Sequence, residues 1–374
     1  MSFDAFGLIY TGDANPRLRD LTVSRAVGAL PFGGRYRVID FVLSDLVNSG
    51  VNSVGLITQK NYHSLMDHVG SGKEWDLHRK REGLFLLPPF LTKDSEGIYR
   101  GSADAIRACL GYVRRCKQKY VILSGSHIIF NTTFNEMLER HIETKADITL
   151  MYNEETDFHP EDQNSDLRLY LADDGRVTGM ELDPYRPGSP YRGLDVFIME
   201  KNLLEYLVED AYAHGEYAFI RDILLKKCDS LRIFGWRYDG YDARIDSVGS
   251  YYRANMDMLD PAVRAELYDR KHPIYTKVKD EISASYGPEA AVTGSILADG
   301  CSIRGTVSDS VLFRGVHVGE GTTVRNSIIM QGVIIEDGCT LDNVIIDKGA
   351  TIRKGRTLIG YESFPIILKK NITV

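Results

Sequence analysis

Two spacings of hydrophobic residues divide the chain near residue 288. Up to about residue 260, short runs of consecutive aliphatic residues alternate with segments in which apolar residues recur every three or four positions. The runs are typical of buried strands and the longer spacing of amphipathic helices, so this part predicts a mainly parallel sheet covered by helices. We expect strands at 5–10, 53–58, 120–123, 148–152 and 194–199, a hairpin from 167–170 and 177–180, and helices at 39–46 and at 106–113, the latter capped by Ser102.

After Pro288 the helical spacing stops and a short repeat begins. Five segments share the order charged residue, glycine, any residue, Ser or Thr, aliphatic residue, and their glycines are Gly300, Gly321, Gly338, Gly349 and Gly355. Successive glycines lie 21, 17, 11 and 6 residues apart. Such a repeat predicts a β-solenoid, whose coils stack to bury their inward residues. The alternative is a set of unrelated turns in an all-β domain.

Length and composition fit this two-part organisation. The chain has 374 residues, of which 43% are hydrophobic and 26% charged, with a net charge of −7. The acidic balance argues against a surface dedicated to nucleic acid or to an anionic membrane. The five cysteines lack zinc-site spacing, and no apolar stretch is long enough to span a bilayer, which together predict a cytoplasmic protein with reduced thiols. We expect an α/β domain over 1–260, a connecting segment over 261–288 and a repeat domain over 289–374.

Several local motifs resemble those of bacterial glucose-1-phosphate adenylyltransferase. They lie at 17–22, 32–41, 48–50, 57–59, 99–105, 251–257 and 267–274, and so extend along most of the chain. The resemblance implies a nucleotidyltransferase-type, Rossmann-like sheet domain followed by a left-handed parallel β-helix of hexapeptide repeats. It also implies the synthesis of ADP-glucose from ATP and glucose 1-phosphate, with Mg²⁺ held by two aspartates.

The residues that would carry this chemistry depart from the family pattern. The phosphate loop, A-G-G-x-G-T-R-L in the family, retains Gly12 and Arg17 but has Asp13 and Asn15 within the turn. A carboxylate repels phosphate oxygens, and a loop with fewer glycines presents its N–H groups less freely. Val27 stands where the family has a lysine that faces the nucleotide phosphates.

The implied metal and sugar-phosphate residues are also replaced. Ser126 and Arg244 occupy the positions of the two metal-binding aspartates, and Asp183 that of the lysine that binds the sugar phosphate. Mg²⁺ prefers hard anionic oxygens, which a guanidinium does not supply. The sequence therefore predicts that the Mg²⁺ site is lost, that no cofactor is bound, and that the chain alone has little or no catalysis.

Some residues could still bind ligands. Gly12, Arg17, Gly101, Ser102 and Arg244 are candidates for a nucleotide or another anion, and Arg35 and Arg37 for a phosphorylated effector. Each has a structural alternative: Arg244 could pair with Asp242 or Asp246, Gly101 could serve a turn, and the other two arginines could be solvated. His127 is expected to be a hydrogen-bonded structural residue, since no positioned partner marks it as a base.

The pattern of losses resembles the regulatory subunit that accompanies a catalytic glucose-1-phosphate adenylyltransferase subunit in some Gram-positive bacteria. This resemblance implies a catalytically deficient subunit that forms homo- and hetero-oligomers, heterotetramers among them, and modulates its partner in glycogen biosynthesis. Two alternatives remain open. One is a weak or altered nucleotidyltransferase with a metal displaced to Asp13, Asp183 or Asp246, and the other is a stand-alone sensor of sugar phosphates.

Overall fold

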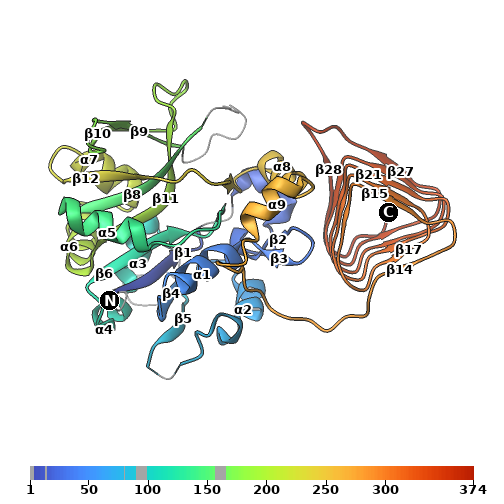
Figure 1. Ribbon diagram of the computed structural model, residues 1–374, viewed down its shortest axis with the longest axis horizontal. Coiled ribbons are helices and arrows are strands. Elements are labelled where there is room, and N and C mark those ends of the chain that lie inside the picture. Colours follow the sequence, from blue (N-terminus) through green and yellow to red (C-terminus); the bar gives the residue numbers. More distant parts are fainter. Residues whose placement is uncertain (1–3, 13–14, 80, 90–98, 156–165) are drawn as a thin grey trace.

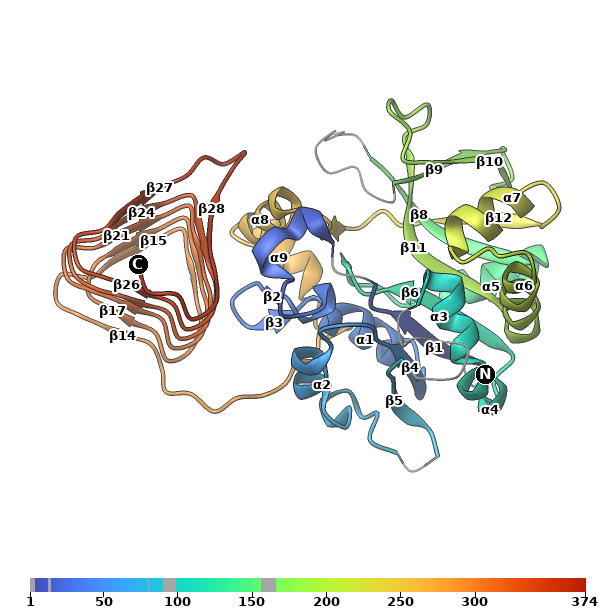
Figure 2. The same cartoon turned by 180° about the vertical axis from the view of Figure 1, so that it is seen from behind.

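An α/β domain and a three-sided coil of strands make up the molecule (Figure 1). The computed structural model describes residues 4–12, 15–79, 81–89, 99–155 and 166–374. Figure 2 shows from behind that helices α8 (Val248–Asp257) and α9 (Pro261–Leu267) lie between the central sheet and the coil. The predicted fold class, a nucleotidyltransferase-type sheet domain followed by a left-handed parallel β-helix, is confirmed.

A nine-stranded sheet forms the centre of the α/β domain, in the order β10-β9-β11-β6-β1-β4-β5, with β8 paired to β11 and β12 paired to β8. Strands β6, β1, β4 and β5 are mutually parallel, and β11 runs antiparallel to β6. All the expected strands and the hairpin form, whereas β5 and β12 were not predicted. The strand bounds are β1 (Ala5–Tyr10), β4 (Ser53–Ile57), β5 (Gly83–Leu87), β6 (Tyr120–Gly125), β8 (Ile148–Glu154), β9 (Leu167–Leu171), β10 (Val177–Leu182), β11 (Tyr191–Glu200) and β12 (Ile233–Arg237).

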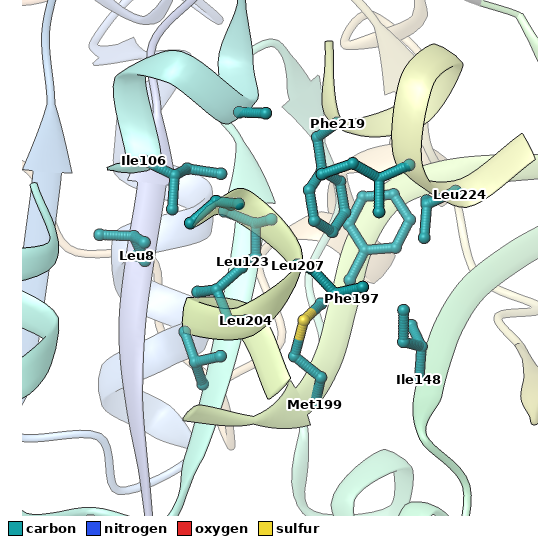
Figure 3. Packing of buried hydrophobic residues seen from close by; sticks show 14 of the residues in the cluster. Leu8, Ile106, Leu123, Ile148, Phe197, Met199, Leu204, Leu207, Phe219 and Leu224 are labelled. Carbon is teal, nitrogen blue, oxygen red and sulfur yellow. The ribbon is translucent and has the colours of Figure 1, made fainter. Parts of the chain in front are cut away.

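Helices cover both faces of this sheet. One face packs against α3 (Ser102–Ala108), α4 (Leu110–Arg115) and α6 (Lys201–Ala213) through the apolar cluster drawn in Figure 3, and the other packs against α1 (Ile39–Asn48) and α5 (Asn135–Thr144). The remaining helical segments are η1 (Pro16–Leu21), η2 (Val27–Ala29), α2 (His63–Val69), η3 (Lys73–Trp75), the π-helical η5 (Phe219–Leu224) and α7 (Leu225–Lys227). Short strand pairs are β2 (Pro31–Phe32) with β3 (Tyr36–Arg37), and β7 (Ile128–Ile129) with β13 (Ala243–Arg244).

The expected helix at 106–113 differs from the prediction in two ways. It is two helices, because α3 ends at Ala108 and α4 begins at Leu110. Ser102 is the first residue of α3 and does not cap it; its Oγ accepts a hydrogen bond from the Phe219 N–H at 3.0 Å. A serine before an apolar periodic run is a good capping signal, but here a distant backbone donor competes for the hydroxyl.

The C-terminal domain is a coil with three parallel five-stranded sheets. His317 pairs with Ile334, and Ile334 with Thr351, so each of these two turns takes 17 residues, whereas the turn from Ser302 to His317 takes 15. This period explains the 17-residue spacing of Gly321, Gly338 and Gly355, which occupy equivalent corners with φ between 65° and 73°. The sheets are β14 (Ser285–Tyr286), β17 (Ser302–Ile303), β20 (His317–Val318), β23 (Ile334–Ile335) and β26 (Thr351–Ile352); β15 (Ala291–Thr293), β18 (Thr306–Ser308), β21 (Thr323–Arg325), β24 (Thr340–Asp342) and β27 (Thr357–Ile359); and β16 (Ile296–Leu297), β19 (Val311–Leu312), β22 (Ile328–Ile329), β25 (Val344–Ile346) and β28 (Ile366–Leu368).

The two domains share a buried apolar interface. Tyr251 and Tyr252 of α8 belong to the same cluster as Phe313, Met330 and Ile345 of the coil. The Tyr252 hydroxyl donates to the Asn326 carbonyl at 2.7 Å.

An extended connector leads from α9 to β14. The first strand of the coil, β14, lies at 285–286, a few residues before the start at 289 that the sequence predicts for the repeat domain. Among the described helices, none is long and apolar enough to cross a membrane.

Candidate functional site

A cleft of about 580 Å³ opens at the carboxyl ends of β1 and β6. This is the edge at which open α/β sheets bind ligands, because loops from neighbouring parallel strands meet there. The cleft is lined by both apolar and polar residues, and we call it the sheet-edge cleft. Its apolar wall comprises Val27, Ile106, Leu123, Phe197, Phe219, Ile220 and Ile245, and its polar wall includes Thr11, Asn15, Arg17, Ser102, Ser124, His127, Asp195 and Asp246.

Gly101 and Ser102 lie at the junction of the apolar wall with η5. A Cβ on Gly101 would stand 2.4 Å from the Tyr217 carbonyl oxygen, so the close approach of two backbone segments requires glycine there. The Tyr217 carbonyl accepts the Ala103 N–H at 2.8 Å. Gly101 therefore holds α3 against η5 and also lines the cleft.

Five described residues of the segment that aligns with the phosphate loop line the cleft: Thr11, Gly12, Asn15, Pro16 and Arg17. Gly12 has φ +65°, and Arg17 lies at the mouth with an exposed side chain. Asn15 caps η1 by accepting the Arg17 N–H at 3.0 Å, and its Nδ2 donates to the Asp246 carbonyl at 2.7 Å. The asparagine thus joins the loop to the start of α8. Asp13 lies outside the described residues.

Arg244 and His127 form a hydrogen-bonded pair beside the cleft. Arg244 is buried on β13, and its Nε donates to His127 Nε2 at 3.2 Å. Burial first, and the guanidinium second, lower the pKa of His127 to about 4. The imidazole is therefore neutral at pH 7 with its proton on Nδ1. Arg244 is not among the described residues that line the cleft, and it donates to His127, whereas the alternative considered for it was a pair with Asp242 or Asp246.

Two carboxylates belong to the polar wall of the cleft. Asp246 precedes α8, accepts the Ser250 hydroxyl at 3.2 Å, and has a pKa raised to about 6 by burial against the opposing effect of Arg244. Asp195 lies in β11 with φ +55°, where the pairing with β8 shifts register, and its Oδ2 is 3.8 Å from His127 Nε2. The sequence reasoning missed Asp195 because it read 194–199 as a buried strand. An aspartate inside an apolar run was the available signal.

The residues at the two implied metal-binding positions, Ser126 and Arg244, do not fit Mg²⁺. Ser126 is buried, and its Oγ lies 3.1 Å from where a Cβ on Gly28 would stand, so it packs behind the cleft. Arg244 adds a positive charge at the second implied position. Within the part of the chain that the structure describes, no group of three or more His, Cys, Asp or Glu side chains could hold a metal ion. A hydroxyl and a guanidinium offer no anionic oxygen to a hard cation.

Beyond Asp195, where the sheet continues into β8 and β9, the arginine side chains form ion pairs with nearby carboxylates. Arg192 binds Glu155 at 2.8 Å and Asp242 at 2.7 Å, and Arg168 pairs with Glu155 and with Asp166. Each of these cations is therefore already neutralised by carboxylates of the same chain.

Asp183 is not among the described residues that line the cleft, and it contacts Asp166 of this network. It follows β10 on the surface with φ +54°, and its Oδ1 accepts the Asp166 N–H at 2.9 Å. A carboxylate held by a backbone donor in this way supplies no charge that would attract a sugar phosphate.

A second site lies between the domains, and we call it the interdomain basic pocket. Arg35 and Arg37 both line it, together with residues that the sequence reasoning did not single out. The pocket has a volume of about 40 Å³. Arg314 is buried there, and its Nε has no hydrogen-bond partner among the described residues. The other lining residues are Pro31, Gly34, Tyr36, His68, Lys277, Lys279, Phe313, Gln331 and Lys348.

Comparisons with known proteins agree with this geometry. The Nucleotidyl transferase family model matches residues 6–234, and the model of the GlmU-like C-terminal hexapeptide region matches residues 281–364. The fold and the matches define a member of the nucleotidyl transferase family with a hexapeptide-repeat domain.

Comparison with individual relatives identifies the particular family within this class. The chain is 38% identical to the glycogen biosynthesis protein GlgD of Bacillus subtilis over 82% of its length and 78% of that relative. It is 41% identical to GlgD of Geobacillus stearothermophilus over 82% and 79% of the two chains, and 32% identical to the glucose-1-phosphate adenylyltransferase of the same organism over 87% and 84%. The chain belongs to the glucose-1-phosphate adenylyltransferase family and is related to proteins of glycogen biosynthesis.

Proposed function

We propose that this protein is a regulatory, catalytically deficient subunit of bacterial glucose-1-phosphate adenylyltransferase. It would modulate the synthesis of ADP-glucose by a catalytic subunit of the same family in the cytoplasm. The observation that carries the proposal is the pair formed by Arg244 and His127, which puts a guanidinium where the family resemblance implies a metal-binding aspartate. Nucleotidyl transfer depends mainly on positioning and on neutralisation of phosphate charge by metal ions, so the loss of such ligands removes most of the rate.

The neutral histidine and the ion pairs support the same proposal. His127 has a pKa of about 4 and holds a proton on Nδ1, so at neutral pH it supplies no positive charge to a phosphate. Arg168 and Arg192 already form ion pairs with Glu155, Asp166 and Asp242, so they are not free to bind a sugar phosphate. The chain retains the apolar wall that could bind a base, with Gly12, Arg17, Gly101 and Ser102 around it.

Regulation would act through the interdomain basic pocket and through assembly. Arg35 and Arg37 contribute to a pocket whose lining carries positive charge from both domains, which suits a phosphorylated effector. A ligand that binds one arrangement of the two domains better than another shifts the population toward it. Homo- and hetero-oligomers, with heterotetramers among them, would carry that shift to the catalytic partner.

The test is the rate of ADP-glucose synthesis, coupled to pyrophosphate release, for this chain, for a catalytic subunit from the same organism, and for their mixture. We expect no activity from the chain alone and a higher rate, or an altered effector response, in the mixture. Size-exclusion chromatography with light scattering on the same mixture reports the hetero-oligomer. A mixture that behaves as the sum of its parts would contradict the proposal.

A weak nucleotidyltransferase is the second candidate, because Asp195 and Asp246 both face the sheet-edge cleft. Two carboxylates could hold a displaced metal ion together with nucleotide oxygens. Calorimetric titration of ATP in the presence and absence of Mg²⁺ separates the two functions. A metal-dependent isotherm that disappears in Asp195→Asn would favour the transferase, whereas a metal-independent one would favour the regulatory subunit.

A further inference from the structure

One carboxylate of the sheet-edge cleft lacks a partner of opposite charge. Asp195 lines the cleft with a side chain that is 20% exposed, and its Oδ2 lies 3.8 Å from His127 Nε2. That nitrogen accepts the Nε proton of Arg244, so it has no proton to donate to the carboxylate. Among the described residues, Asp195 therefore receives neither a hydrogen bond nor a cation. A largely buried carboxylate in this condition is stabilised by a donor that a ligand brings.

The backbone around Asp195 holds this carboxylate in the cleft. Asp195 has φ +55°, and the pairing of β11 with β8 shifts register between Gly193 and Phe197. A Cβ on Gly125, at the end of β6, would stand 2.6 Å from Asp195 Oδ2 and 2.7 Å from His127 Cε1, so glycine is needed to leave room for both side chains. Left-handed backbone at a residue other than glycine is uncommon and is concentrated at ligand-binding positions.

Thr11 provides a second polar atom without a partner. It follows β1, is only 3% exposed and lines the cleft, and its Oγ1 makes no hydrogen bond with any described residue. Buried hydroxyl groups are nearly always hydrogen-bonded, so a ligand in the cleft is a suitable partner for this one.

An aromatic surface lies beside the unpaired carboxylate. Phe197 also lines the cleft and is two residues from Asp195 on β11, which is about 7 Å along a strand. Phe197 and Phe219 meet edge to face with ring centroids 5.5 Å apart. Figure 3 shows both rings in the apolar cluster that also contains Ile106 and Leu123 of the cleft wall. A flat ring placed on this wall would bring a substituent about 7 Å away to Asp195.

The other charges of the cleft do not favour an anion. Of the described residues that line it, Asp195 and Asp246 are carboxylates and Arg17 alone carries a fixed positive charge. Arg17 is exposed at the mouth and is one of the charges that oppose the effect of burial on the pKa of Asp246. Arg244 donates to His127 and is not among these lining residues. The lining therefore has a negative balance, which disfavours a phosphate group.

We propose that the sheet-edge cleft binds an aromatic molecule that carries an ammonium group and no phosphate. The ring would lie on the wall formed by Phe197 and Phe219, and the ammonium would donate to Asp195. The volume of about 580 Å³ is in the usual range for sites that bind small organic molecules. The inference goes beyond the proposed regulatory function, which does not depend on it. It also reverses the preference for phosphate that a nucleotidyltransferase site requires.

The experiment is isothermal titration calorimetry of the full chain at pH 7 without Mg²⁺, with three probes that share a purine and a ribose. They are 5′-amino-5′-deoxyadenosine, whose amine is protonated at this pH, adenosine, and AMP. We expect the ammonium compound to bind about ten- to a hundredfold more tightly than adenosine, as is typical of a hydrogen bond to a charged group, and AMP to bind most weakly. Tighter binding of AMP, equal affinities, or no binding of any probe would overturn the inference. The rate of ADP-glucose synthesis in the mixture of subunits remains a separate test of the regulatory function.

Two substitutions assign the ammonium to Asp195. Asp195→Asn removes the charge and keeps a residue that tolerates left-handed backbone, so the ammonium compound should lose its advantage while adenosine still binds. Asp173→Asn changes an exposed aspartate in the turn between β9 and β10 and should keep the preference of the wild type. Thermal unfolding of both variants shows whether they are folded. A preference that persists in Asp195→Asn would place the ammonium elsewhere and overturn the proposal.

Discussion

Single residues decide the charge of the sheet-edge cleft. The Arg244 guanidinium donates to His127 Nε2, and this contact fixes the tautomer of the imidazole and opposes its protonation. The guanidinium also acts on Asp246, whose pKa it lowers against the larger effect of burial. One buried arginine therefore lowers the pKa of both His127 and Asp246, which lie beside the same cleft.

Replacement of Arg244 should change the titration of His127 in a defined direction. In Arg244→Met the pKa of His127 should rise from about 4 but stay below 6.5, because burial is the larger of the two causes. Proton NMR titration of the histidine ring resonances measures it. His141 is the control, since burial alone is the main cause that lowers its pKa to about 4. An unchanged His127, or an equal shift of both histidines, would contradict the assignment.

Asp246 should make the stability of the protein pH-dependent. Burial raises its pKa from 3.8 to about 6, so the folded state binds this proton more tightly than the unfolded state does. The free energy of unfolding therefore falls as the pH rises between about 4 and 6, and the loss is complete above that range. Asp246→Asn retains an oxygen for the Ser250 hydroxyl and removes the titration.

Urea unfolding at pH 4.5 and at pH 7 tests this expectation. Between pH 4.5 and pH 7, the free energy of unfolding of Asp246→Asn should rise by about 2 kcal/mol relative to that of the wild type, which loses the contribution of the Asp246 proton. Asp280→Asn changes an exposed carboxylate on the connector and should show no such gain. Parallel pH profiles of Asp246→Asn and the wild type would refute the role of Asp246.

At the scale of elements, the junction between α3 and η5 shapes the apolar wall of the cleft. The Gly101 backbone lies against the Tyr217 carbonyl, and the Ser102 hydroxyl accepts the Phe219 N–H. The Asp222 carboxylate accepts the N–H groups of Tyr217 and Ala218 at 2.9 and 2.8 Å, which closes the start of η5. These bonds hold Phe219 and Ile220 against the cleft.

Alanine at two glycines should have opposite effects. Gly101→Ala places a Cβ 2.4 Å from backbone, so we expect a loss of about 1–3 kcal/mol in free energy of unfolding. Gly111→Ala, on the exposed side of α4 with no atom within 4 Å of its Cβ, should be neutral or stabilise by up to about 1 kcal/mol. Thermal and urea unfolding of both variants give the comparison. A Gly101→Ala protein as stable as Gly111→Ala would show that η5 moves without cost.

At the scale of the whole molecule, the two domains are joined by an apolar interface that encloses an ion pair. Arg25 and Asp347 have side chains only 4% and 3% exposed, and Arg25 belongs to the loop that leads to Val27 in the cleft. Asp347 is next to Lys348 in the interdomain basic pocket. The cleft and the pocket are therefore connected through one buried contact.

Loss of one partner of this pair should be costly. Asp347→Ala leaves a buried guanidinium without its counter-charge, so the free energy of unfolding should fall by about 3–5 kcal/mol. The double substitution Arg25→Met with Asp347→Leu should recover most of that loss, because it removes both charges. Glu320→Ala, which breaks an exposed pair with Arg304, is the control and should have no measurable effect. Equal stability of Asp347→Ala and Glu320→Ala would contradict a buried electrostatic link between the domains.

Local patterns in the sequence were enough for most elements. The strand at Ala5–Tyr10 was predicted to its exact bounds, and the glycine repeat predicted the coil, because both depend on backbone geometry and on burial of neighbouring residues. The split between α3 and α4 was not predictable, since apolar spacing continues across Cys109. The unusual residues Ser126 and Arg244 could be recognised from the sequence, but not the partners that they contact.

Tertiary structure alone decided the contents of the two sites. Asp195 faces the cleft because a register shift in β11 turns it away from the core, and Arg244 reaches His127 only because β13 pairs with β7. The basic pocket draws on segments near residues 35, 277, 314 and 348, which no local spacing connects. Hydrophobic periodicity is set by each element's own burial, whereas charge clusters depend on which distant elements pack together, and that packing decides the electrostatics of this protein.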